Sequence, residues 1–334
     1  MKLAIWQKKT GAHRSARPGK IEDLLAHRTV GTPLRAGRLE MIPLFGSPEA
    51  ADVFAPPQTA LELARVMTYG HVVLKNRSDR PTIAPMHIGH LQKGAQNHAT
   101  CRAWVLPPYG EAEQLDACCI QAGQGGYISG ADERFIVLPL ALRAKAFSLR
   151  GQQNFSKLWG DISKLNAQMG LKYRGHLDEL KQAHQPIMMR VAHRLERQTG
   201  QTGAVFYVDG RFVGIELAPD AVFFEELFTP LVMYCYAPMT LAPPLEGGEP
   251  ALELESHGLE NLEHLASRLE ALHERRHARA LERVARLSDR EIATSLGEQP
   301  YRYTLVDVEA EDFVGQALLT GDTGAAYASL TWVM

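Results

Sequence analysis

The hydrophobic pattern changes its period part-way along the chain, which predicts a β-rich part followed by helices. From Leu39 to about Gly130, short apolar runs alternate with clusters of turn-forming residues, as is typical of short strands in hairpins. The runs are His71–Leu74, Thr82–Ala84, Ala103–Leu106 and Ala117–Gln121. Gln58–Thr68 is the expected exception, because Leu61, Ala64 and Val66 predict the apolar side of a short helix.

Later apolar positions recur every three or four residues, which predicts helices. One set is Phe155, Leu158, Trp159, Ile162, Leu165 and Met169, with Gly170 at the expected helix end. A second set is Met188, Val191 and Leu195, which follows Pro186 and ends near Gly200. Asp220 is the predicted N-cap of a third helix, which turns Val222, Phe223, Leu227 and Leu231 inward.

A β-hairpin interrupts the helical part. Ala204–Val208 and Arg211–Leu217 are β-type runs separated only by Asp209 and Gly210. An Asp-Gly pair favours the tight turn that joins two antiparallel strands. This is the clearest local prediction in the chain.

The C-terminal part is predicted to hold a loop, a long helix and closing strands. Leu241–Pro250 is rich in proline and glycine and is expected to be a linker. The helix should run from Gly258 to Leu287, and its apolar residues should form one buried stripe: Leu262, Leu265, Leu269, Leu272, Leu281, Val284 and Leu287. Ser288 to Glu291 has capping-box spacing, so we expect a second short helix there. Tyr301–Val306 and Tyr327–Val333 return to β character.

These elements predict an α+β fold: a β-rich N-terminal half with hairpins, then helices and a closing β segment. We expect three parts: a basic arm at 1–38, a core at 39–240, and a region at 241–334 whose linker, helix and strands pack on that core. The arm is expected to carry a short helix near Ile21–Ala26.

Composition excludes several classes of protein. In a chain of 334 residues, 45% hydrophobic content provides for a large core and argues against disorder. A net charge of -2 gives no overall attraction to nucleic acid, so such a partner would need a local patch. The basic arm is one candidate, and the arginines of the long helix are another, although glutamates on the same helix favour a solvated face.

The lengths of the apolar stretches predict where the protein is located. The longest apolar stretches are too short to span a bilayer, and the first residues lack the apolar core of a signal peptide. We therefore expect a soluble, cytoplasmic protein with no membrane partner. Its four cysteines are expected to be reduced.

The densest polar cluster lies at His87–Cys101. His87 with His90, and His98 with Cys101, have the two-residue gap of paired zinc ligands. Only one of these four residues is a thiolate, and seven residues separate the pairs. We therefore expect no metal, and the sequence implies no cofactor.

A second interpretation of this cluster is a ligand site. Lys93, Gln96, Asn97 and His98 bring an ammonium, two amides and an imidazole together beside Gly94, and such donors suit a phosphate or a ribose. The alternative is a polar loop whose side chains only satisfy its own backbone. Common hydrolase motifs are missing, since neither G-x-S-x-G nor H-E-x-x-H occurs.

An ordered series of motifs resembles a known family. The segments are Val72–Asn76, Arg80–Ile83, Gly89, Lys93–Asn97, Val105–Pro108, Cys119–Ile120 and Gly123, followed by Leu149–Trp159, Gly203–Leu217, Leu231–Ala237 and, weakly, Gly315–Trp332. They resemble a bacterial family of largely uncharacterised proteins. That family is named for its association with ADP-ribosylglycohydrolases and rhodanese-phosphatase-superfamily proteins.

The resemblance implies a substrate class but no particular reaction. The family pattern has an acidic residue where this chain has His90, an arginine where it has His98, and Glu, Arg and Trp where it has Gln121, Gln124 and Gly125. Because glutamine holds no titratable proton, a carboxylate acid or base cannot be transferred to Gln121.

We therefore expect recognition or processing of an ADP-ribose-like or nucleotide-derived ligand, in a stress or NAD-linked pathway. His90 or His98 would be the acid/base, Lys93 would hold phosphate, and Gln96, Asn97, Gln121 and Gln124 would orient the sugar. Gln96 and Gln121 should then face one cavity. The alternative is a non-catalytic adaptor that docks on a protein or nucleic acid through the basic arm and the long helix.

Overall fold

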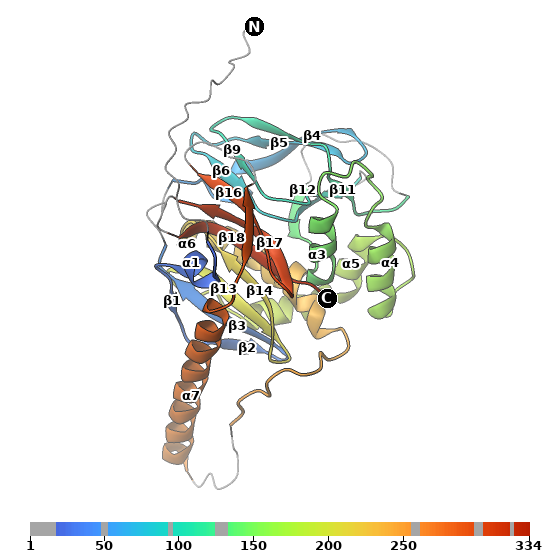
Figure 1. The fold of residues 1–334 in the computed structure, drawn as a ribbon. Coiled ribbons are helices and arrows are strands. Elements are labelled where there is room, and N and C mark those ends of the chain that lie inside the picture. The colour runs from blue at the N-terminus through green and yellow to red at the C-terminus, as the bar shows by residue number, and fades with distance from the viewer. Residues whose placement is uncertain are drawn as a thin grey trace.

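The computed structural model describes residues 18–47, 53–92, 96–123, 133–254, 261–296, 303–320 and 324–334. Within them, nine strands form one antiparallel sheet in the order β1-β3-β13-β14-β18-β17-β16-β15, with β2 also paired to β3 (Figure 1). The bounds are β1 Thr29–Val30, β2 Leu34–Ala36, β3 Leu39–Phe45, β13 Gln201–Val208, β14 Arg211–Leu217, β15 Ala293–Leu296, β16 Thr304–Glu309, β17 Phe313–Leu319 and β18 Ala325–Trp332. The sheet thus combines strands from the beginning, the middle and the end of the chain.

Three smaller sheets hold the strands of residues 61–137. They are β10-β5-β4, β11-β8-β7-β12 and β6-β9, all with antiparallel pairing. The bounds are β4 Leu61–Thr68, β5 His71–Asn76, β6 Thr82–Ala84, β7 Ile88–Gln92, β8 His98–Ala99, β9 Trp104–Leu106, β10 Glu111–Gln114, β11 Cys118–Cys119 and β12 Glu133–Val137. The prediction of a β-rich first half and an α+β fold is confirmed.

Helices cover both faces of the large sheet. Their bounds are α1 Ile21–Leu25, α2 Pro57–Ala60, α3 Leu140–Ser148, α4 Trp159–Gln168, α5 Leu177–Arg194, α6 Ala221–Pro230, the π-helix η1 Leu231–Tyr236, the 3-10 helix η2 Ala237–Thr240 and α7 Leu262–Ser288. Alternate residues of β13 face opposite sides, as a strand requires. Phe206 packs with η1 and α6, and Val205 packs with α1 and α7. No helix in the described residues is long and apolar enough to cross a membrane.

The hairpin and the N-cap form as predicted. Asp209 and Gly210 have φ of 50° and 76°, the left-handed geometry of a type I′ turn, which only short polar residues and glycine adopt readily. Asp220 accepts a hydrogen bond from the backbone N–H of Phe223 at 2.8 Å. Both features depend on neighbouring residues alone, which is why the local sequence predicts them.

Three helix predictions are wrong. In the predicted helix Gln58–Thr68, only the part within Pro57–Ala60 is helical, and Leu61–Thr68 is strand β4. Leu61 and Leu63 are buried there, and the strand pairs with β5. Ser288 opens no second helix, since it is the last residue of α7 and its hydroxyl donates to Val284 O. The helix expected after Pro186 begins earlier, at Leu177, and continues through the proline.

The stripe on the long helix is only partly buried. Leu272, Val284 and Leu287 are buried, whereas Leu262, Leu269 and Leu281 are 83%, 48% and 46% exposed. Figure 1 shows a reason for the first two: the first turns of α7 extend away from the body of the molecule, so no sheet lies beneath them. The expectation that the whole stripe is buried is wrong.

The basic face of α7 contacts the preceding loop. We call residues 249–252 the strap. Arg276 and Arg279 donate to the carbonyl oxygens of Leu252 and Pro250, and Arg283 and Arg286 bind the carboxylate of Glu249. These arginines therefore hold the strap against the helix.

The core contains a buried ion pair. Arg143 on α3 has no exposed area, and it donates to Glu216 Oε1, to Ser329 Oγ and, at 3.1 Å, to His87 Nδ1. Tyr236 Oη also donates to Glu216 Oε1, at 2.9 Å. The network joins α3 to β14, β18 and η1.

Candidate functional site

The predicted histidines lie side by side in the four-stranded sheet. Pairing places Phe135 on β12 opposite His90 on β7, His90 opposite His98 on β8, and His98 opposite Cys119 on β11. Directly paired residues point to the same face of a sheet. We call these four residues the histidine row. His90 and His98 were predicted site residues, whereas Cys119 was not. The segment Cys119–Ile120, which belongs to the family resemblance, is the feature of the sequence that could have indicated it.

His98 has both ring nitrogens engaged. Its Nδ1 lies 3.0 Å from Gln96 O, and because a carbonyl only accepts, Nδ1 carries the proton. Its Nε2 then accepts from the N–H of Gly70, in the β4–β5 turn, at 3.5 Å. Burial lowers the pKa of His98 to about 4, against the bond to Gln96 O, which raises it. The ring is therefore neutral at neutral pH.

Two glutamines lie beside Cys119. Gln96 Nε2 donates to Cys119 Sγ at 2.8 Å, and Cys119 Sγ contacts Gln121 O at 3.4 Å. Burial raises the pKa of Cys119, so its sulfur is a neutral thiol. The side chain of Gln96 and the backbone carbonyl of Gln121 thus both contact Cys119, and that the two glutamines face one cavity stays a prediction.

Each of these glutamines keeps an unpaired atom. The side-chain oxygens of Gln96 and Gln121 are buried and accept no hydrogen bond in the described part of the chain. An unpaired buried amide oxygen costs about 1–3 kcal/mol. Each of these two oxygens can therefore accept a hydrogen bond from a bound group.

The other predicted residues are placed as follows. Asn97 is buried, and its carbonyl accepts from Ile120 N at 3.0 Å, which ties the two loops together. Lys93 and Gln124 lie outside the described residues. His87 belongs to the network of Arg143 instead, where burial and then the charge of Arg143 lower its pKa. In the ranges that the structure describes, no three His, Cys, Asp or Glu side chains gather as metal ligands.

The opposite face of this sheet borders a small apolar cleft. Leu91 on β7 and Ile136 on β12 line it with Leu177 and Met188 of α5. Leu91 follows His90 in β7, and successive side chains alternate, so the cleft and the histidine row lie on different faces. Asp178 and Lys181, 3.7 Å apart, are its charged lining residues.

Comparison with protein families gives one match. The model of the ARG and Rhodanese-Phosphatase-superfamily-associated Protein domain matches residues 27–320. The chain belongs to this family. Comparison with curated proteins found no match. Comparison with solved structures found none either.

The ARG and Rhodanese-Phosphatase-superfamily-associated match includes every strand of the site. It therefore covers the histidine row and both glutamines. His98 is paired with both Cys119 and His90, and the backbone carbonyl of Gln121 contacts Cys119 Sγ. The family is associated with the ADP-ribosylglycohydrolase and rhodanese-phosphatase superfamilies, which is consistent with ADP-ribose pathways.

Proposed function

We propose that the histidine row and the glutamines beside it recognise an ADP-ribose-like or nucleotide-derived ligand. The observation that carries the proposal is the pair of unpartnered amide oxygens of Gln96 and Gln121. Ribose hydroxyls both donate and accept hydrogen bonds, so they pair with either end of an amide. Such a ligand would satisfy both glutamines at once.

The proposal gives the remaining residues the following roles. His98 is neutral, so in this proposal Lys93 contacts the phosphates, while Asn97 and Gln124 help to orient the sugar. If the protein cleaves its ligand, His90 or His98 is the acid/base. Positions 90 and 121 hold no carboxylate, which favours recognition over hydrolysis.

Ligand binding can be tested by thermal shift. ADP-ribose should raise the melting temperature of the wild-type protein, because a ligand that binds only the native state stabilises it by about 2.7 kcal/mol at 100 times Kd. Gln96→Leu and Gln121→Leu should abolish the shift. Gln114→Leu is the matched control, since Gln114 is also buried with an unpaired amide but lies on β10 in another sheet.

Two results would overturn the proposal. One is the lack of a shift with ADP-ribose, NAD and AMP alike. The other is an equal shift in all three variants, which would place the ligand elsewhere. Chromatography of the recovered ADP-ribose separates recognition from cleavage, and His90→Gln tests the acid/base role if products appear.

The adaptor alternative has less support. It needs free arginines on α7, but Arg276, Arg279, Arg283 and Arg286 contact the strap. An anionic partner would have to displace those contacts.

A further inference from the structure

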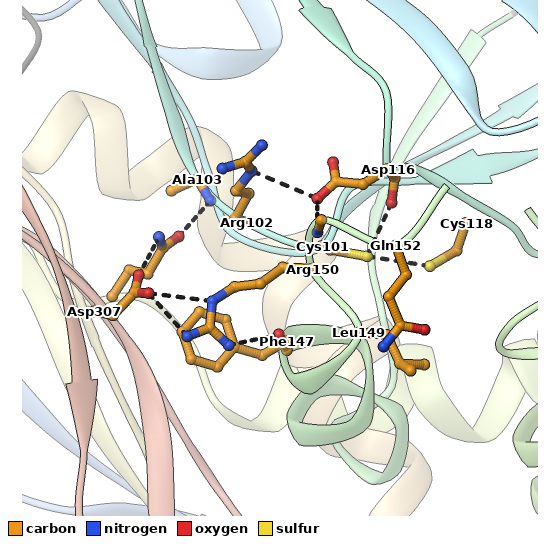
Figure 2. Close-up of polar contacts among 12 residues, drawn as sticks. Cys101, Arg102, Ala103, Asp116, Cys118, Phe147, Leu149, Arg150, Gln152 and Asp307 are labelled. Carbon is orange, nitrogen blue, oxygen red and sulfur yellow. Dashed lines mark hydrogen bonds and ion pairs between the residues drawn. The ribbon is translucent and has the colours of Figure 1, made fainter. Parts of the chain in front are cut away.

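Two cysteines on the other face of the four-stranded sheet touch each other. Cys118 lies on β11 opposite Ala99, and Cys101 follows two residues after Ala99. Their sulfur atoms are 3.2 Å apart (Figure 2). A disulfide bond is about 2.05 Å long, so a small side-chain movement would join them. We propose that Cys101 and Cys118 form a dithiol that a hydroperoxide oxidises to an intramolecular disulfide.

Charged groups next to the pair distinguish the two sulfurs. Cys101 Sγ lies 3.2 Å from Asp116 O, and Lys157 Nζ donates to that same oxygen at 2.6 Å. The hydrogen bond from Cys118 and then the charge of Lys157 lower the pKa of Cys101, against burial and the charge of Asp116, whereas the pKa of Cys118 is raised. In this proposal Cys101, whose sulfur lies beside the carbonyl oxygen that Lys157 binds, is the attacking thiolate, and Cys118 is the thiol that resolves it.

The carboxylate of Asp116 has partners of its own. Its Oδ2 accepts from Gly151 N at 2.6 Å and lies 3.6 Å from Arg102 Nε (Figure 2). The charge of Arg102 offsets part of the negative charge of Asp116. The ammonium group of Lys157 is thus the positive charge near Cys101 that favours its thiolate form.

The reaction balances in two steps. The thiolate of Cys101 attacks one peroxide oxygen and breaks the O–O bond, which gives a sulfenic acid and the hydroxide or alkoxide that leaves. The sulfur of Cys118 then attacks Cys101 Sγ, and the sulfenic hydroxyl departs with the Cys118 proton as water. Two thiols are oxidised by two electrons, and one hydroperoxide is reduced.

The chain offers two matched controls. Cys119 and Cys235 are equally buried, but neither contacts another cysteine. Cys119 lies between the two glutamines, and Cys235 lies 3.4 Å from Arg143 Nη1. Burial raises the pKa of Cys235 to about 12 and also raises that of Cys119. Both should stay reduced when the pair oxidises.

The test is thiol counting by mass spectrometry on the full-length reduced protein. Treatment with hydrogen peroxide should lower the mass of the intact protein by two hydrogens. Alkylation in denaturant should then modify two cysteines, and one cross-linked peptide pair should contain residues 101 and 118. Dithiothreitol should reverse the change. Cys119→Ser and Cys235→Ser should each still form the link between residues 101 and 118, with one alkylated cysteine left.

Trapping identifies the first step. Cys118→Ser should keep a sulfenic acid at Cys101 that reacts with dimedone. A cross-link that involves Cys119 or Cys235, a link between two chains, or full alkylation of all four cysteines after peroxide treatment would overturn the proposal. The wild-type measurement alone decides between these outcomes, so a variant that fails to fold leaves the test intact. Because it involves no nucleotide, the test is also independent of the proposed ligand.

Discussion

Replacing Glu216 with glutamine should destabilise the protein more than any single change at an exposed ion pair. Arg143 has no exposed area, and Glu216 is the carboxylate that it contacts. Glu216→Gln keeps the shape of the side chain but leaves a buried guanidinium without a counter-ion. Breaking a buried pair in this way costs about 3–5 kcal/mol, a large part of the roughly 5–15 kcal/mol that stabilises a folded protein.

The assay is urea unfolding at pH 7 followed by circular dichroism, with a matched control. Glu111→Gln removes the same charge from the pair of Arg65 and Glu111, whose side chains are 51% and 37% exposed. Exposed pairs contribute about 0–1 kcal/mol, so this midpoint should hardly move. The reasoning is refuted if the two variants lose the same stability, or if Glu216→Gln loses less than about 1 kcal/mol.

Three further predictions concern α7, His98 and the hairpin. Leu272→Asp should unfold the protein, whereas Leu269→Asp should leave it folded because Leu269 is exposed. Circular dichroism of each single variant tests this, and unfolding of both would contradict it. Because the pKa of His98 falls to about 4 in the folded protein, protons favour the unfolded state. The contribution of His98 to the free energy of unfolding is fully present above about pH 6.5, and roughly 3 kcal/mol is lost toward pH 4. His98→Asn should make this loss smaller, and an unchanged dependence of stability on pH in the variant would disprove the prediction. Gly210→Ala should cost more than Gly151→Ala, since both have positive φ but only a Cβ at 210 meets Glu249 O; equal melting temperatures would contradict this.

The sequence predicted what neighbouring residues determine. The turn at Asp209 and Gly210 and the N-cap at Asp220 need only local hydrogen bonds and φ values. Leu61–Thr68 was misassigned because its strand is stabilised by pairing with β5, and the spacing of its apolar residues fits a helix as well. Tertiary pairing overrides such weak local preference.

The site was predicted in part for the same reason. His90 and His98 stood out as a polar cluster, but their register with Cys119 depends on β11, about 20 residues later. No local pattern reveals that register. Likewise, the arginines of α7 looked like a solvated face because the sequence does not show that the strap folds back onto them.

The position of β18 has a consequence for how the protein is made. Of the described strands this one is synthesised last, yet it lies between β14 and β17 in the large sheet. Until Ala325–Trp332 emerges, β14 keeps an open apolar edge, and β15, β16 and β17 have no connection to the earlier strands. Long-range pairing of this kind is slow and exposes aggregation-prone edges. A nascent chain that stalls before residue 325 would therefore hold two half-sheets that β18 unites.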